Sequence, residues 1–246
     1  MKKLILVLAC FMPFAVIADD HAPAAPAIAV VYECALNEGV AAADLVTFGR
    51  SDVKKFVAKS DLTMNSYLWE AIAVNEPYRE ADVRWVNYFP TWDDYYAADA
   101  AFGSDGASLV GQFNSMVTCE KEVIFGVQNL MSDLVVADQK PFVASVCQLN
   151  DGKTLADGMQ FSKQVIDMAG KTADANVGGT VFTPVFGISG FDYVATFYGE
   201  TSEMIKLMNG VRDRSMPAAM VQAGLQPAAD CVNDLHMSHM MVQQPQ

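Results

Sequence analysis

Histidine is scarce in this chain, with three residues among 246. His21 lies near the start, while His236 and His239 lie near the end, so no interior segment places an imidazole beside a serine or cysteine nucleophile. The sequence also lacks a Gly-x-Ser-x-Gly elbow and a phosphate-binding loop. The nearest pattern, at 187–190, reads as a hairpin turn. These absences argue against a hydrolase that uses a catalytic triad.

Basic residues are also few. The chain holds 16 Lys and Arg against 29 Asp and Glu, which gives a formal net charge of −13 at pH 7. Such a surface repels the phosphates of nucleic acid and the headgroups of anionic lipid. We therefore expect no nucleic acid partner, and we read the acidity as a solubility feature of an exported protein.

Long apolar runs are missing except at the N-terminus, where a basic start is followed by Leu4–Ile17. That run is shorter than the roughly 20 residues of a membrane span. Val16 and Ala18 suit the −3 and −1 positions of a cleavage site, which predicts a signal peptide over 1–18. An uncleaved anchor and a lipoprotein at Cys10 are the alternatives. Because the apolar run continues past Cys10, we expect cleavage, a periplasmic or secreted protein, and no membrane contact afterwards.

Four cysteines remain after cleavage, and they bracket a repeated module. The pattern Cys-x-Leu-Asn-(Glu/Asp)-Gly begins at Cys34 and again at Cys147. Cys119 and Cys231 follow these two at nearly equal separations. Four cysteines allow three pairings, but a duplicated module should carry its own bridge, which predicts Cys34–Cys119 and Cys147–Cys231. There is no Cys-x-x-Cys pair, so a zinc or redox site is disfavoured.

The duplication predicts the domain organisation. We expect a signal peptide at 1–18, a flexible tail at 19–26, one repeat at 27–131, a linker at 132–139 and a second repeat at 140–242.

Both repeats show the same order of elements. In the first we expect strand Ala27–Tyr32 continuing to Cys34, helix Ala41–Ala58, strands Tyr67–Val74 and Val83–Phe89, a helix capped by Thr91, and a strand from Cys119 to Val127. In the second we expect strand Phe142–Cys147, helix Thr154–Ala169, strands Thr180–Phe186 and Phe191–Tyr198, helix Thr201–Val211, and a strand from Cys231 to about Met241. The order β-α-β-β-α-β is that of the ferredoxin-like fold. Its first and last strands are antiparallel neighbours, as the two bridges require.

The predicted fold class is therefore α+β, with two tandem ferredoxin-like repeats packed as an intramolecular α/β barrel. This arrangement resembles the dimeric α/β-barrel superfamily, which includes the antibiotic-biosynthesis monooxygenase-like proteins. The resemblance covers nearly the whole mature chain and rests on element order and duplication. It implies a pseudo-dimer in one chain, a small apolar ligand between the sheets, and enzymes that often work without a cofactor.

Aromatic strand residues are the candidates for a ligand site. Tyr67 and Trp69 share one face of a strand, and Trp85 and Asn87 share one face of its neighbour. Comparable positions in the second repeat are Phe182 and Tyr198. Glu70 and Arg84 are the ionisable residues near them. The alternative is plain core packing between the sheets. The repeated Asn-(Glu/Asp)-Gly is interpreted as turn chemistry.

A metal site is the other candidate. Cleavage after Ala18 would leave a chain that begins Asp19-Asp20-His21, whose amine, amide nitrogens and imidazole suit copper(II) or nickel(II). A chance match in a flexible tail is the alternative.

The leading hypothesis is an exported protein of undefined activity that binds a small apolar or aromatic molecule in a cleft between the repeats. The alternative is a cofactor-independent monooxygenase-like enzyme, and the third is a copper-binding protein. We expect no bound cofactor, apart from possible copper at the tail, and a monomer or weak homo-oligomer.

Overall fold

The computed structural model describes residues 27–75, 81–130 and 138–243. The predicted signal peptide, the tail and the Asp19-Asp20-His21 metal motif lie outside the described residues, so these three stay predictions. The predicted domain boundaries also stay predictions.

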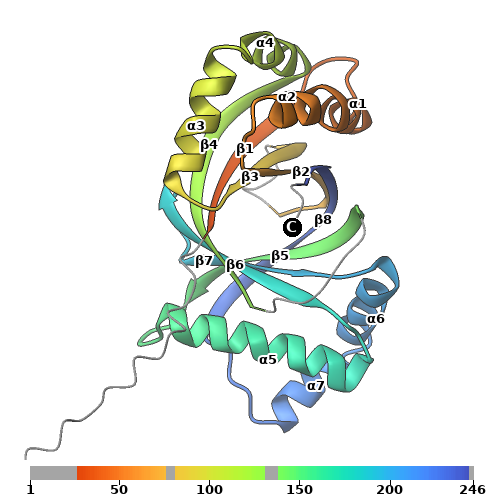
Figure 1. Cartoon of the computed structure of the whole chain (residues 1–246). Helices are drawn as coiled ribbons and strands as arrows, with labels where there is room; N and C mark the ends of the chain where they lie inside the picture. Colours follow the sequence, from red (N-terminus) through yellow and green to blue (C-terminus); the bar gives the residue numbers. More distant parts are fainter. Residues whose placement is uncertain (1–26, 76–80, 131–137, 244–246) are drawn as a thin grey trace, which may run out of the picture.

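Eight strands form a closed barrel in the order β1-β3-β2-β8-β5-β7-β6-β4, with antiparallel pairing between all neighbours (Figure 1). Their bounds are β1 Ala27–Leu36, β2 Asn65–Ala73, β3 Val83–Phe89, β4 Val117–Asn129, β5 Gln139–Leu149, β6 Gly178–Phe186, β7 Tyr193–Tyr198 and β8 Ala229–Val242. The pairs β2–β8 and β4–β6 join the first half of the chain to the second. Closure removes the exposed sheet edges that would otherwise invite pairing with other chains.

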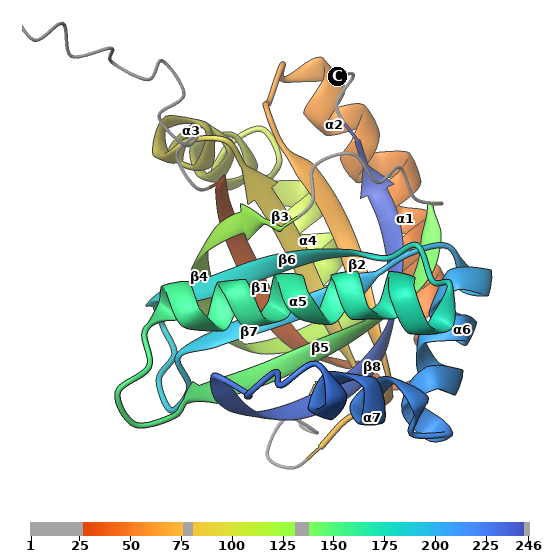
Figure 2. The ribbon, with the colours of Figure 1, turned by 90° about the horizontal axis from the view of Figure 1, so that it is seen from below.

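Helices cover the barrel on two opposite sides (Figure 1). On one side lie α1 Ala42–Phe48, η1 Gly49–Val53, α2 Lys54–Lys59, α3 Trp92–Gly103 and α4 Ala107–Met116; on the other lie α5 Leu155–Ala173, α6 Thr201–Arg212 and α7 Ser215–Gln222. Seen from below, α5 crosses the strands of the second half (Figure 2). Within the described residues, none of the helices is long and apolar enough to cross a membrane.

Most predicted elements are present, with two differences. The helix predicted over Ala41–Ala58 contains a π-helical turn, η1, between α1 and α2. The helices α4 and α7 were not predicted, because α4 buries none of its residues fully and α7 buries only Met216, so neither has a clear apolar stripe. The predicted N-cap is confirmed: the Thr91 hydroxyl accepts a hydrogen bond from the Asp94 amide at 3.2 Å.

The two predicted disulfides are confirmed. Cys34 on β1 lies directly opposite Cys119 on β4, and Cys147 on β5 lies opposite Cys231 on β8. Disulfides persist in oxidising compartments, and they fit an extracellular protein. The turn interpretation of the repeated Asn-(Glu/Asp)-Gly is also confirmed, because Gly39 has φ +82° and Gly152 has φ +75°.

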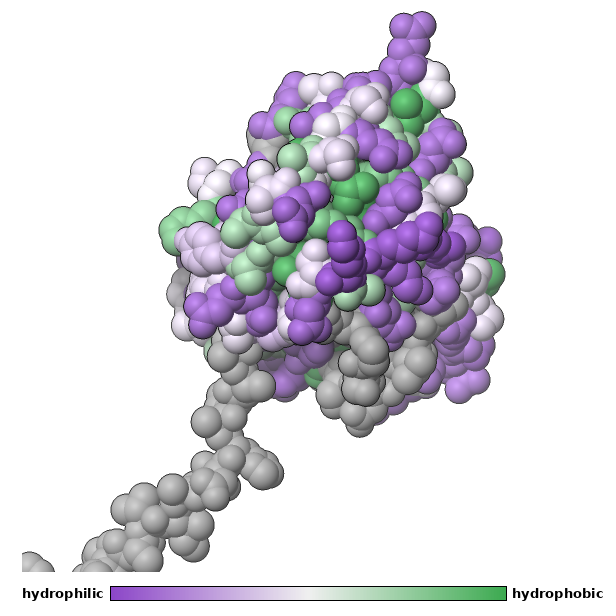
Figure 3. Space-filling model, turned by 45° about the horizontal axis from the view of Figure 1, so that its top comes forward, coloured by the Kyte–Doolittle hydropathy of each residue, from purple (hydrophilic) through white to green (hydrophobic). Residues whose placement is uncertain are grey.

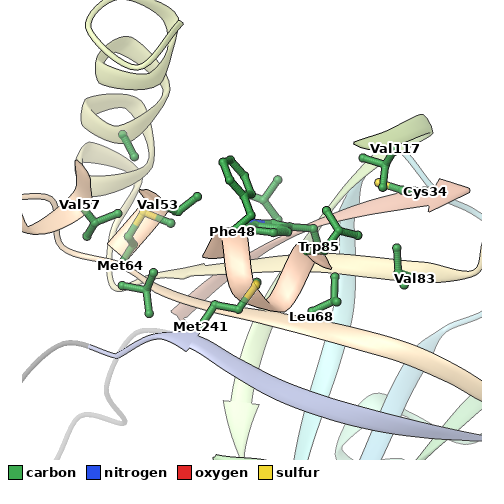
Figure 4. Close-up of a cluster of buried hydrophobic side chains, with 14 of the residues drawn as sticks. Cys34, Phe48, Val53, Val57, Met64, Leu68, Val83, Trp85, Val117 and Met241 are labelled. Atoms are coloured by element: carbon green, nitrogen blue, oxygen red, sulfur yellow. The ribbon is translucent and has the colours of Figure 1, made fainter. Parts of the chain in front are cut away.

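Buried apolar side chains form three clusters. One lies between α1–α4 and the outer face of the first-half strands (Figure 4). A second lies between α5–α7 and the outer face of the second-half strands. The third fills the barrel interior and includes Val31, Val86, Phe125 and Phe182. Each strand therefore buries side chains on both faces, which explains the high apolar content of the strands.

Candidate functional site

The six predicted ligand residues divide between the two faces of the sheet. Trp69 packs in the barrel interior, with its ring 5.7 Å from that of Phe182. Tyr67 and Tyr198 also face inward, and their rings share the ammonium group of Lys140 at 5.8 and 5.2 Å. The remaining two, Trp85 and Asn87, face outward toward the helices of the first half. The six residues therefore do not form one site.

The space between the two halves is mostly filled by side chains and is not the open cleft that the sequence predicts. Aromatic side chains from both halves meet inside the barrel, as the contact of Trp69 with Phe142 at 4.9 Å illustrates. Near Trp69 and Phe182 they leave an interior cavity of about 70 Å³. For these inward-facing aromatics, the alternative of core packing describes the structure better, because strand side chains alternate between faces and the inner set fills the barrel.

A larger pocket lies outside the barrel, under the helices of the first half. Its volume is about 340 Å³, and it is bounded by the outer faces of β1 and β3, the α1–η1 segment and the pair α3–α4. Its apolar walls are aromatic: the Trp85 ring lies 5.0 Å from that of Phe113 and 6.2 Å from that of Phe48. Figure 4 shows Phe48 and Trp85 facing each other in this region. Figure 3 shows hydrophobic residues exposed among hydrophilic ones on this side of the molecule.

Asn87 supplies oriented polar atoms to the pocket wall. Its Oδ1 accepts hydrogen bonds from Trp85 Nε1 at 3.0 Å and from Ser66 Oγ at 2.8 Å. An indole nitrogen can only donate, so the amide oxygen must face Trp85. The Nδ2 group therefore points away from this pair, and Asn87 is one of the residues that line the pocket. An amide N–H group at such a wall is the kind of donor that stabilises negative charge on a substrate oxygen.

Two tyrosines and a glutamate form a second polar group at the pocket edge. The hydroxyls of Tyr32 and Tyr95 each donate to Glu122 Oε1 at 3.4 Å. Burial, and then the negative charge of Glu122, raises the pKa of Tyr32 well above its usual value and that of Tyr95 to about 12. Both phenols therefore stay protonated near neutral pH. Asp99, one turn after Tyr95 on α3, adds an exposed carboxylate to the lining.

The charges around this pocket have one sign. Among its described lining residues there is no Lys, Arg or His, whereas Asp99 lines it and Glu122 lies at its edge. An anionic ligand would be repelled here, while a neutral aromatic molecule matches the walls.

The pocket residues do not suit a haem or another bound metal. Haem iron takes a histidine, a thiolate, a thioether or a phenolate. Cys119 is held in a disulfide, and the hydroxyls of Tyr32 and Tyr95 are both bonded to Glu122. Met64 is 2% exposed and packs in the core of the first half, while His236 and His239 lie on β8, outside this pocket. Among the described residues, no group of three or more His, Cys, Asp or Glu could hold a metal ion.

The two predicted ionisable residues lie on opposite sides of the sheet. Glu70 faces outward, with its Oε2 3.1 Å from Nε2 of His239. Arg84 faces the barrel interior and pairs with Glu33, with Nε and Oε1 3.1 Å apart. Neither lines the helical pocket.

Sequence reasoning missed Tyr32, Tyr95 and Asp99. The sequence did contain a pattern that could have identified Tyr95 and Asp99. Together with Phe102 they are spaced by four and three residues, which places all three on one face of a helix. That α3 covers the outer face of β3, and not a neighbouring surface, follows only from the tertiary structure.

Comparisons with known proteins support the fold. No family model and no curated protein matches the sequence. Among solved structures, a single-residue variant of chlorite dismutase from Candidatus Nitrospira defluvii has a TM-score of 0.53 and 11% identity, covering 87% of this chain and 91% of that one. A candidate monooxygenase from Lactobacillus acidophilus has a TM-score of 0.52 and 10% identity, with 87% of this chain and 94% of that one covered. A candidate monooxygenase from Fusobacterium nucleatum has a TM-score of 0.50 and 11% identity, with 89% of this chain and 94% of that one covered.

The resemblance to the dimeric α/β-barrel superfamily is thus confirmed at the level of the fold. The leading hypothesis, a binding-type protein with a cleft between two repeats, is corrected: the chains that share this fold are named as enzymes, and the barrel interior is filled.

Proposed function

We propose that this chain is a monooxygenase-like enzyme that oxidises a neutral aromatic molecule in the pocket between β1, β3 and the helices α3–α4, without a resident cofactor. The observation that carries the proposal is the combination of aromatic walls with the oriented amide of Asn87. The named monooxygenases of the same fold are consistent with it.

Without a cofactor, the electrons must come from the substrate. An activated methylene can supply four of them: R₂CH₂ and O₂ give R₂C=O and H₂O, with one oxygen atom entering the product and the other leaving as water. The first step is loss of a proton from the substrate, because an anion transfers an electron to oxygen more readily than a neutral molecule. The pocket must therefore accept a proton and stabilise the resulting oxyanion.

We assign these two tasks to different residues. Asp99 is the carboxylate among the pocket-lining residues and takes the role of proton acceptor. The Nδ2 hydrogens of Asn87 stabilise the substrate oxygen on which negative charge develops. The Tyr32 hydroxyl, whose hydrogen is donated to Glu122, can accept a hydrogen bond from a hydroxyl group of the substrate. The aromatic walls hold the ring and exclude water, which strengthens these hydrogen bonds.

The test is oxygen consumption with a panel of neutral hydroxyaromatic compounds that carry an activated methylene, together with mass spectrometry of products formed under ¹⁸O₂. We expect incorporation of one labelled oxygen per product. Asp99→Asn should lower kcat by about 10²–10⁴-fold, the usual contribution of a general base. Asp93→Asn is the matched control, because Asp93 is an exposed carboxylate on the same helix. Equal loss in both variants, or no label in any product, would refute the proposal.

We also propose that the barrel is built from two ferredoxin-like repeats in an exported chain cleaved after Ala18. The element order, the two strand pairs that carry disulfides and the N-terminal sequence support this. Intact mass spectrometry of protein from the exported fraction tests the cleavage. A mass that corresponds to 19–246 with two disulfides is expected, and a mass that includes 1–18 would contradict it.

A further inference from the structure

One rim of the barrel carries a lysine among tyrosines. Lys140 is the second residue of β5, and its Nζ lies 5.8 Å from the centre of the Tyr67 ring and 5.2 Å from that of the Tyr198 ring. Tyr88 completes this lysine–tyrosine cluster, because its ring packs edge-on against that of Tyr67 at 5.5 Å. The four residues come from β5, β2, β7 and β3. Closure of the barrel therefore brings them together.

The Lys140 amine is partly withdrawn from water and has no carboxylate in contact. All four residues of the lysine–tyrosine cluster are half-buried, so the cluster is open to small solutes. Within residues 27–75, 81–130 and 138–243, no carboxylate forms an ion pair with Nζ. Burial lowers the pKa of Lys140 to about 8, although the charges of Glu200 and Asp138 act in the opposite direction from a longer range.

The consequence of this environment is a large fraction of neutral amine near physiological pH. With a pKa of about 8, about a quarter of Lys140 is neutral at pH 7.5, whereas an ordinary exposed lysine with a pKa of about 10.4 is neutral to about 0.1%. The neutral form carries the lone pair that attacks a carbonyl carbon. Lysines that are desolvated in this way are the ones that form Schiff bases in proteins.

The tyrosines supply the proton donors that this chemistry also needs. Formation of a Schiff base requires a donor to the carbonyl oxygen, and later to the hydroxyl group that leaves as water. Burial raises the pKa of Tyr67 and that of Tyr88, so both phenols stay protonated near neutral pH. The tyrosine rings also give the cluster an apolar surface, which favours an uncharged carbonyl compound with a short apolar chain.

We propose that Lys140 forms a Schiff base with a small uncharged aldehyde at this rim, a second site that is independent of the oxidation proposed for the helical pocket. The Nζ lone pair attacks the carbonyl carbon and gives a carbinolamine. The phenol of Tyr67 protonates the hydroxyl group, which leaves as water, and the phenolate takes up the proton that the nitrogen loses. The balance is RCHO and Lys–NH₂ giving RCH=N–Lys and H₂O, without oxidant or reductant.

The experiment treats the full mature protein with propanal and cyanoborohydride, which reduces an imine to a stable secondary amine, over a range of pH. Peptide mass spectrometry measures the rate of alkylation at each lysine and distinguishes the N-terminal amine, whose usual pKa is also near 8. At pH 7.5 we expect Lys140 to react at least tenfold faster than the exposed lysines, with a rate that levels off above about pH 8. Equal rates, or no reaction at Lys140, would overturn the proposal.

Three variants locate the chemistry. Lys140→Arg keeps a cation over the two rings but has no nucleophilic amine, so the fast alkylation should disappear. Lys163→Arg changes an exposed lysine on α5 and should leave it unchanged. Tyr67→Phe keeps the ring and should slow imine formation severalfold; an unchanged rate would refute Tyr67 as the proton donor. If Lys140→Arg does not fold, the pH profile of the unaltered protein still decides, because a rate at Lys140 that keeps rising to pH 10 refutes the site.

Discussion

Asn87 is the residue at which stability and the proposed activity can be separated. Its Oδ1 is the shared acceptor for Trp85 Nε1 and Ser66 Oγ. Trp85 is 6% exposed and Ser66 is fully buried, so neither donor can turn to bulk water when the acceptor is removed. A substitution at Asn87 therefore acts on two buried hydrogen bonds and on the pocket wall at once.

Asn87→Leu has a similar volume but no acceptor. Leaving a buried donor unsatisfied costs about 1–3 kcal/mol, so two donors cost about 2–5 kcal/mol after allowing for partial relaxation. For a chain of this size each kcal/mol lowers the unfolding temperature by roughly 2–4 °C, which predicts a decrease of about 5–15 °C. Thermal and urea unfolding followed by tryptophan fluorescence measure this, because Trp85 itself lies at the perturbed site.

Asn87→Asp is the matched variant. A carboxylate oxygen can still accept from Trp85 and Ser66, so the unfolding temperature should fall much less than in Asn87→Leu. The variant nevertheless loses the Nδ2 donors and places a negative charge where the substrate oxyanion forms. We expect both variants to lose most of the proposed activity, but only the leucine variant to lose most of the stability. If Asn87→Leu is as stable as the unaltered protein, the hydrogen-bond argument fails.

Three other predictions concern stability. Gly49→Ala should destabilise the fold by about 1–3 kcal/mol, because the added methyl would overlap the side chain of Met241. Met241→Ala should cost about 2–5 kcal/mol by itself, and the double variant should lose less in urea unfolding than the sum of the two single losses. Burial, and then the positive charge of Arg84, lowers the pKa of His236 to about 3 in the folded state. Between about pH 3 and pH 6.5 the unfolded chain therefore binds more protons than the folded chain. This contribution to the free energy of unfolding is complete above about pH 6.5 and decreases as the pH falls below it. Between pH 6.5 and pH 4.5 this amounts to about 2 kcal/mol, and His236→Phe should remove that part of the slope, whereas an unchanged slope would contradict the assignment. Replacing Cys34 and Cys119 together by alanine should cost about 4–5 kcal/mol on the chain-entropy model, measured as a lower urea midpoint, and no change in midpoint would argue against the bridge.

Local patterns in the sequence were enough to predict most of the fold. Turn residues, strand alternation and the cap at Thr91 act over a few neighbouring residues, so they can be read without the tertiary structure. The two cysteine pairs added long-range information, because each bridge requires the first and last strands of a half to be neighbours. The helix pair α3–α4 shows the limit: α4 is exposed enough to lack a periodic apolar stripe, yet its Phe113 closes the pocket over Trp85.

The sequence by itself determined which residues share a strand face, since alternation places Tyr67 with Trp69 and Trp85 with Asn87. It did not determine which face looks inward, because both faces of these strands are apolar and periodicity gives the same pattern for either choice. Only closure of the barrel decided this. Closure placed Tyr67, Trp69 and Phe182 in the barrel interior, where they pack against one another and their neighbours. It placed Asn87 on the outer face, beneath the helices, beside a pocket large enough for a ligand.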